Sequence, residues 1–152
     1  FAPSSGSIDA ATILTWGGAS RAGAEAASVP FIMITTAPLL KLIEDTGEGV
    51  LVLVDSLDET EFARSRLTRS EVDRLLRLMG GTLAGLPDAL RSGMPEIDWD
   101  GWSAALRQLD DDAPAVRTDA AWFAARALVP ATLSWLRIHR RSHPDWFRFS
   151  LG

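Results

Sequence analysis

A long stripe of apolar side chains at helical spacing constrains the fold of this chain more than any other feature. It lies between Thr68 and Arg91, and its members recur every three or four positions, which places them on one face of a helix. The stripe consists of Val72, Leu75, Leu76, Met79, Leu83, Leu86 and Leu90. Thr68 and Glu71, three residues apart, are typical of a capping box and predict the start of this helix. A helix of this kind must bury its apolar side.

Three glycines interrupt the same helix, at Gly80, Gly81 and Gly85. Each weakens a helix interior by about 1 kcal/mol relative to alanine. We therefore expect them to serve a close approach between helices.

Two further helices are predicted towards the C-terminus. One begins at Asp98 or Trp99 and ends in the acidic run 110–112. Carboxylates at a helix C-terminus oppose the helix dipole, so we expect this end to be frayed or tied to another group. The other runs from Thr118 or Asp119 to about Arg141, and Pro130 should kink it. Together with the first stripe, these helices predict a core. Its members are Val72, Leu76, Met79, Leu83, Trp99, Trp102, Leu106, Trp122, Leu133 and Leu136.

The first third of the chain is open to two interpretations. Residues 38–57 carry an apolar helical stripe, whereas Val50 to Val54 is equally consistent with a buried strand. We expect the helix, and an all-α antiparallel bundle of four to five helices. The predicted organisation is an N-terminal extension of uncertain structure (1–37), a helical domain (38–143) and an aromatic tail (144–152). That tail, with Trp146, Phe147 and Phe149, should dock on its own bundle or on a second subunit, and we favour the former.

Composition limits the function classes. The 152 residues fit one domain, contain no cysteine and only two histidines, and carry a net charge of −5. Disulfides, thiolate metal sites and multi-histidine zinc sites are thereby excluded, and we expect no metal and no cofactor. We find no signal peptide and no membrane-spanning run, and expect a cytoplasmic protein that does not bind DNA, since phosphate affinity depends on Lys and Arg.

Several short motifs occur in an order that resembles the HepT-like ribonuclease toxins of the HEPN superfamily. They are Leu57 with Phe62, the Thr68 helix with its small patch at 80–82, Leu86-Pro87-Asp88-Ala89-Leu90-Arg91, Pro95-Glu96-Ile97-Asp98-Trp99, Asp119 with Trp122, and Val129-Pro130. The resemblance covers about residues 38–140. It implies a HEPN-like helical bundle, a homodimer, metal-independent RNA cleavage, and a nucleotidyltransferase-like antitoxin as partner.

The active-site motif of that family is not intact in this chain. The family has Arg-Asn, three residues, then His-x-Tyr between the two Trp positions; here the corresponding places hold Arg107, Asp111 or Asp112, and Ala113 or Pro114. Metal-free RNA cleavage needs a group of near-neutral pKa and a cation for the phosphate. Arg107 supplies a cation, but an aspartate of ordinary pKa is a poor acid at neutral pH and repels phosphate.

Two functions follow from this resemblance. One is a catalytically degenerate HepT-like toxin of a toxin–antitoxin pair, with Arg107, Asp111 and Asp112 at the degenerate motif positions. The alternative is a non-catalytic helical module, derived from the same fold, that binds another protein. In both cases we expect a homodimer with Gly80, Gly81 and Trp102 at its interface, and at most weak contact with RNA.

Overall fold

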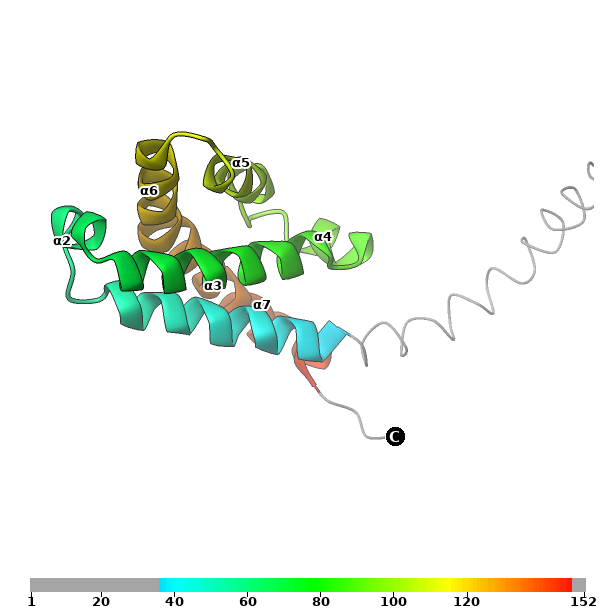
Figure 1. The fold of residues 1–152 in the computed structure, drawn as a ribbon. Coiled ribbons are helices and arrows are strands. Elements are labelled where there is room, and N and C mark those ends of the chain that lie inside the picture. Colours follow the sequence, from blue (N-terminus) through cyan, green and yellow to red (C-terminus); the bar gives the residue numbers. More distant parts are fainter. Residues whose placement is uncertain (1–35, 149–152) are drawn as a thin grey trace, which may run out of the picture.

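The computed structural model describes residues 36–148 and is all-helical over that range, with no strand among the described residues (Figure 1). The all-α class predicted from the sequence is therefore confirmed for this range, whereas the described residues form more helices than the four to five that we expected. A first helix covers residues 36–54. It is followed by α2 (Glu59–Arg64), α3 (Arg66–Ala84), α4 (Asp88–Gly93), α5 (Trp99–Leu109), α6 (Pro114–Phe123), a π-helical turn (Ala124–Leu128), α7 (Val129–Ser142) and a 3₁₀ turn (Pro144–Phe147). The predicted extension 1–37 lies outside the described residues except for its last two positions.

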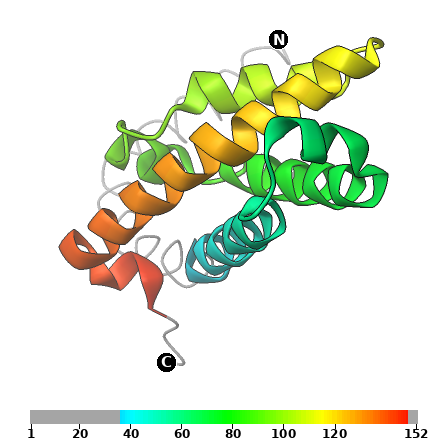
Figure 2. The ribbon, with the colours of Figure 1, turned by 90° about the vertical axis from the view of Figure 1, so that its left-hand side faces the viewer.

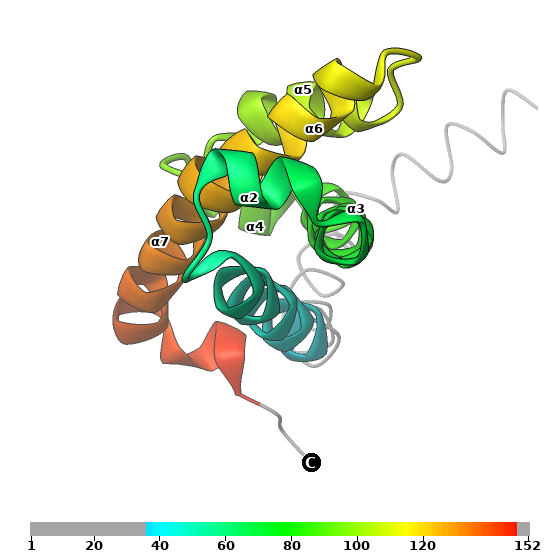
Figure 3. The same cartoon turned by 60° about the vertical axis from the view of Figure 1, so that its left-hand side comes forward.

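The helix over residues 36–54 and α3 run antiparallel, side by side (Figures 1 and 3). Val50 to Val54 belongs to this helix, so the strand interpretation is wrong. Gly47 and Gly49, which lie within this helix, are contact points. A Cβ added at Gly47 would lie 2.9 Å from Leu133 of α7 and 3.1 Å from Met79 of α3. The helix thus packs closely against two others at this glycine, and a larger residue would require Leu133 or Met79 to move.

The start of α3 differs from the prediction. Ser65, not Thr68, is its N-cap and accepts a hydrogen bond from the Thr68 backbone N–H, while Glu71 pairs with the Arg74 guanidinium instead. The capping box of this region belongs to α2, between Asp58 and Glu61. Ser65 is also the C-cap of α2. One serine therefore ends one helix and begins the next.

The predicted helix from Thr68 to Arg91 is two helices. α3 ends at Ala84, and α4 begins at Asp88 after Pro87. Proline disfavours helical geometry in the residue before it, here Leu86, and cannot donate a backbone hydrogen bond. The apolar stripe nevertheless continues across the break, since Leu83, Leu86 and Leu90 are all buried.

α5 crosses α3 at Gly80. A Cβ built on this glycine would lie 2.9–3.1 Å from three side-chain carbons of Leu106. The expected close helix approach is thus confirmed at Gly80. Gly81 differs, because nothing lies within 4 Å of the same position there.

The last part of the bundle is one continuous helix from Pro114 to Ser142, interrupted in its winding at Ala124–Leu128 (Figure 2). It begins at Pro114, earlier than predicted, with the proline in the first turn, where its missing N–H is harmless. Pro130 cannot give a hydrogen bond to the carbonyl of Arg126. The disturbance expected from Pro130 takes the form of a π turn directly before it.

The core lies between these helices. Seven of the ten predicted core residues are buried: Val72, Leu76, Met79, Leu83, Trp102, Leu133 and Leu136. Trp99, Leu106 and Trp122 are half-buried and pack against the same cluster. Phe62 of α2 is fully buried and lies with its ring centroid 5.2 Å from that of Trp122.

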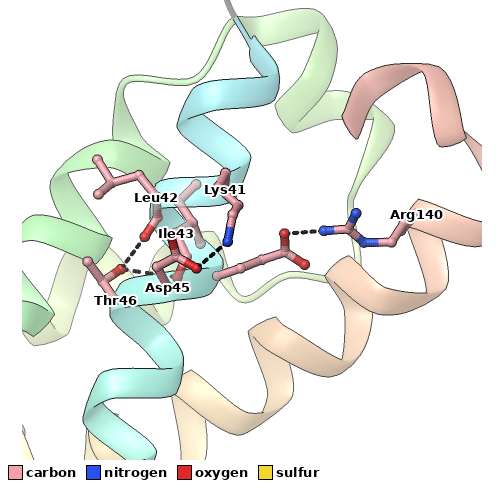
Figure 4. A network of polar contacts seen from close by, with 7 residues as sticks. Lys41, Leu42, Ile43, Asp45, Thr46 and Arg140 are labelled. Atoms are coloured by element: carbon pink, nitrogen blue, oxygen red, sulfur yellow. Dashed lines mark hydrogen bonds and ion pairs between the residues drawn. The ribbon is translucent and has the colours of Figure 1, made fainter. Parts of the chain in front are cut away.

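Polar contacts join the first helix to α7 (Figure 4). Glu44 pairs with Arg140, while Lys41 and Asp45 form an ion pair of 2.7 Å one turn apart. Thr46 donates to the Leu42 carbonyl at 2.8 Å, so its buried hydroxyl stays within its own helix.

The tail docks on its own chain over residues 144–147. The Trp146 ring stacks on His143 at 4.0 Å, and a Cβ at Gly93 would lie 3.0 Å from Trp146. Phe147 lies against the Arg140 guanidinium at 4.6 Å. This is the docking that we favoured from the sequence; Phe149 lies outside the described residues. Over 36–148, no helix combines the length and apolar character needed to cross a bilayer.

Candidate functional site at the corner between α5 and α6

The three predicted catalytic positions lie at one corner of the bundle, where α5 ends and α6 begins (Figure 1). Arg107 is in the last turn of α5, is exposed, and has no side-chain partner among the described residues. Asp111 and Asp112 are exposed in the connecting turn. The Asp111 carboxylate accepts a hydrogen bond of 2.9 Å from the Ala113 backbone N–H. This carboxylate therefore stabilises its own turn and is not paired with Arg107.

The acidic end of α5 is tied down, as one of our two expectations for it required. Arg77 of α3 donates to the Asp110 carboxylate at 2.6 Å and to the Leu109 carbonyl at 2.8 Å. It also pairs with Asp73, one turn before it, at 2.8 Å. These carboxylates raise the pKa of Arg77 above its ordinary value, chiefly through the hydrogen bond to Asp73 and then that to Asp110. Arg77 thus compensates the charge that opposes the α5 dipole.

A second arginine holds the turn from the other side. Arg117, in the first turns of α6, donates to the backbone carbonyls of Asp111 at 2.6 Å and Asp112 at 3.1 Å. Neither contact is to a carboxylate, so the positive charge of Arg117 is not neutralised by an ion pair among the described residues.

An open pocket of about 300 Å³ lies beside this corner, between α3 and the α5–α6 turn. We call it the arginine pocket. Its charged and hydroxyl-bearing lining residues are Arg66, Arg69, Ser70, Asp73, Arg77, Arg117 and Thr118, and its apolar ones are Leu109, Pro114 and Ala121. Arg107, Asp111 and Asp112 do not line it. The catalytic positions inferred from the resemblance and the arginine pocket are therefore adjacent but separate.

The predicted interface residues have different surroundings. Gly80 and Trp102 are buried within the chain, where Gly80 contacts Leu106 and Trp102 donates its indole N–H to the Thr132 hydroxyl at 2.9 Å. Trp102 therefore offers almost no surface to a second copy, because only 3% of this residue is exposed. Gly81 is exposed and lines a shallow apolar groove with Leu39 and Leu78.

The two histidines lie far from this corner along the chain, at the C-terminal end of α7. His139 is buried, with Nε2 at 2.8 Å from a Glu96 carboxylate oxygen, whereas its Nδ1 is buried without a hydrogen-bond partner among the described residues. The hydrogen bond from His139 is the main cause that lowers the pKa of Glu96 below its ordinary value. His143 stacks on Trp146. Both imidazoles therefore have packing roles that hold the tail and the loop before α5.

No group of three or more His, Cys, Asp or Glu side chains within residues 36–148 is arranged to hold a metal ion. The carboxylates of the acidic run do not converge on one point. In particular, Asp110 pairs with Arg77, while Asp111 accepts from the Ala113 backbone.

Our reading of the sequence missed the arginine pocket. A signal was present, since Arg66, Ser70, Asp73 and Arg77 recur at spacings of four, three and four and thus share one face of α3. That face is polar, and a polar helix face usually points to solvent, so its spacing did not predict a pocket. Arg117 comes from a helix 40 to 50 residues away, and no local pattern could place it there.

A comparison with protein-family models found no match, and neither the curated proteins nor the solved structures gave one.

Proposed function

We propose that this chain is a catalytically degenerate, HepT-like helical protein that acts by binding and not by cleaving RNA. The observation that carries the proposal is the chemistry of the α5–α6 corner. At the motif positions, the Asp111 carboxylate accepts from the Ala113 backbone N–H, and the Arg107 side chain has no partner among the described residues. Both histidines lie at the other end of the long helix. A general acid–base group of near-neutral pKa, which contributes about 10²–10⁴ in rate, is not supplied there.

The direct test is an RNA-cleavage assay in the presence of a metal chelator. We expect no cleavage by the natural chain and no change on Arg107→Ala. Metal-independent cleavage that disappears in Arg107→Ala or Asp111→Asn would contradict the proposal, because a carboxylate–arginine pair would then replace the acid–base group. As a gain-of-function comparison, the double variant Asp111→His, Ala113→Tyr restores both missing side-chain types at exposed positions. Because it also removes the carboxylate that accepts from the Ala113 N–H, circular dichroism must establish that this variant is folded.

The binding partner that this proposal favours is a nucleotidyltransferase-like protein, as the resemblance implies. Neither Ala113 nor Pro114 has a hydroxyl that such an enzyme could modify. The predicted complex is therefore a stable association without covalent modification. Co-expression with a nucleotidyltransferase encoded next to this chain, followed by size-exclusion chromatography and intact-mass measurement, tests both parts.

We also propose a homodimer. Among the three residues predicted for its interface, Gly81 is the exposed one, and the apolar groove beside it, with Leu39 and Leu78, is the surface that a second copy would cover. Light scattering at micromolar concentration tests this, and a monomer would contradict it.

A further inference from the structure

We infer that the arginine pocket is a binding site for a compact phosphate dianion, such as inorganic phosphate or the phosphate group of a small phosphate monoester. The inference rests on the pocket alone and does not depend on the proposed function. Four guanidinium groups from two helices converge on one open cavity of about 300 Å³, a volume at the lower end of the range for small-molecule sites.

The charges of the pocket do not balance. Arg77 is paired with Asp73 and Asp110, whereas Arg66, Arg69 and Arg117 have no carboxylate partner among the described residues. Arg69 donates to the Ala63 carbonyl and Arg117 to the carbonyls of the acidic turn, which position these side chains without neutralising them. Four guanidinium groups paired with only two carboxylates leave two positive charges without an ion-pair partner among the described residues. A dianion would balance them, and guanidinium groups bind phosphate through paired N–H donors.

The neutral part of the pocket also favours an anion. Pro114, Arg117 and Thr118 come from the first turns of α6, a helix of 10 residues whose N-cap, Ala113, has no side chain that can accept from the free N–H groups. The positive end of the α6 dipole therefore lies at the pocket wall. Ser70 and Thr118 add two hydroxyl groups that can donate to phosphate oxygens.

The surroundings favour a compact ligand over a long polyanion. The exposed carboxylates of Asp111 and Asp112 lie in the turn whose carbonyls Arg117 binds, and the whole chain carries a net charge of −5. A nucleic-acid strand leaving the pocket towards this turn would meet negative charge within a Debye length of about 8–10 Å. A single phosphate held by the arginines does not extend along this turn and meets less of that repulsion.

The test measures binding of inorganic phosphate, of a sugar phosphate and of a single-stranded RNA oligonucleotide to the full chain by isothermal titration calorimetry. Two pocket variants are used. Arg66→Glu changes an exposed side chain without a partner among the described residues, so folding should be preserved, and Arg117→Ala removes a guanidinium that also holds the turn. Arg141→Ala, an exposed arginine in the last turn of α7, is the matched control.

We expect saturable binding of phosphate and of the sugar phosphate, weakened at least about tenfold by Arg66→Glu and by Arg117→Ala, and unchanged by Arg141→Ala. Circular dichroism establishes that each variant is folded. Equal binding in all variants, or no saturable binding at millimolar phosphate, would overturn the inference. Tight binding of RNA alone, sensitive to Arg66→Glu, would also overturn it, since the pocket would then serve a nucleic-acid strand.

Discussion

Replacing Gly80 and Gly81 one at a time by alanine should change the stability of the bundle in opposite directions. The two glycines are neighbours in α3 and share the same helix propensity, for which alanine is better by about 1 kcal/mol. Gly81→Ala adds a methyl group with no atom from elsewhere in its own chain within 4 Å and should realise this gain in the monomer. Gly80→Ala places the methyl group 2.9–3.1 Å from Leu106, and overpacking of this kind costs about 1–3 kcal/mol.

The expected net effect of Gly80→Ala is therefore between no change and a loss of about 2 kcal/mol, and the two variants should differ by about 1–3 kcal/mol. The measurement is the free energy of unfolding from urea titrations followed by tryptophan fluorescence. It should be made at two protein concentrations, because a dimer makes the apparent stability depend on concentration.

The double variant Gly80→Ala, Leu106→Ala identifies the cause. Removing the Leu106 side chain relieves the contact, so Gly80→Ala should cost little or no unfolding free energy in that background. The resulting coupling energy should be about 0.5–3 kcal/mol, as for other residues in direct contact. Equal stabilisation by Gly80→Ala and Gly81→Ala would refute the reasoning, because α3 and α5 could then not approach as closely at Gly80 as the structure has them.

Two other predictions test the polar contacts of the fold. Thr132→Val removes the buried hydroxyl that accepts a hydrogen bond from the Trp102 indole N–H and should destabilise the protein by about 1–3 kcal/mol. In the control Thr82→Val, the exposed hydroxyl donates only to the Leu78 carbonyl, so stability should change by less than about 0.5 kcal/mol. Thermal unfolding compares the two variants, and equal effects would contradict a stabilising hydrogen bond between Trp102 and Thr132. The hydrogen bond from His139 lowers the pKa of Glu96, so the folded state favours the ionised carboxylate. The resulting contribution to stability is present above the ordinary pKa of 4.5 and is lost as the pH falls through the lowered pKa. The stability advantage of the natural chain over Glu96→Gln should therefore shrink on acidification, as denaturant titrations at neutral and acidic pH would measure, and an advantage that does not depend on pH would contradict this assignment.

Periodicity in the sequence did not predict the short helices α2 and α4, but it was sufficient to predict the long helices, because each one buries an apolar face that repeats along the chain. It was not sufficient for their boundaries. Thr68 and Glu71 have the spacing of a capping box, yet Ser65 caps α3, since the turn that ends α2 already fixes the backbone there. Leu83, Leu86 and Leu90 continue one stripe across a break that Pro87 imposes, so the pattern alone could not show two helices.

The candidate site could be predicted only in part for a related reason. The positions of Arg107 and Asp111 at a helix end followed from the sequence. Contacts between distant segments did not, because Arg77 reaches Asp110 and Trp102 reaches Thr132 only after the helices have packed. The arginine pocket likewise depends on contacts between distant segments. The polar stripe on α3 can be seen in the sequence, but Arg117 of α6 reaches the pocket only through tertiary packing.

The π turn before Pro130 has a consequence for the angular phase of the long helix. Up to Leu136 its buried residues repeat every four positions, as the pairs Ala120 and Ala121, Ala124 and Ala125, Leu128 and Val129, Thr132 and Leu133, followed by Leu136 itself. In a regular α-helix each step of four residues overshoots a full turn by about 40°, so the apolar side would wind about 160° around the axis between residues 120 and 136. The wider turn at Ala124–Leu128 absorbs one residue, equivalent to about 100°. The remaining rotation of about 60° fits within the width of an ordinary apolar stripe, so α6 and α7 present the same side to the core over their joint length.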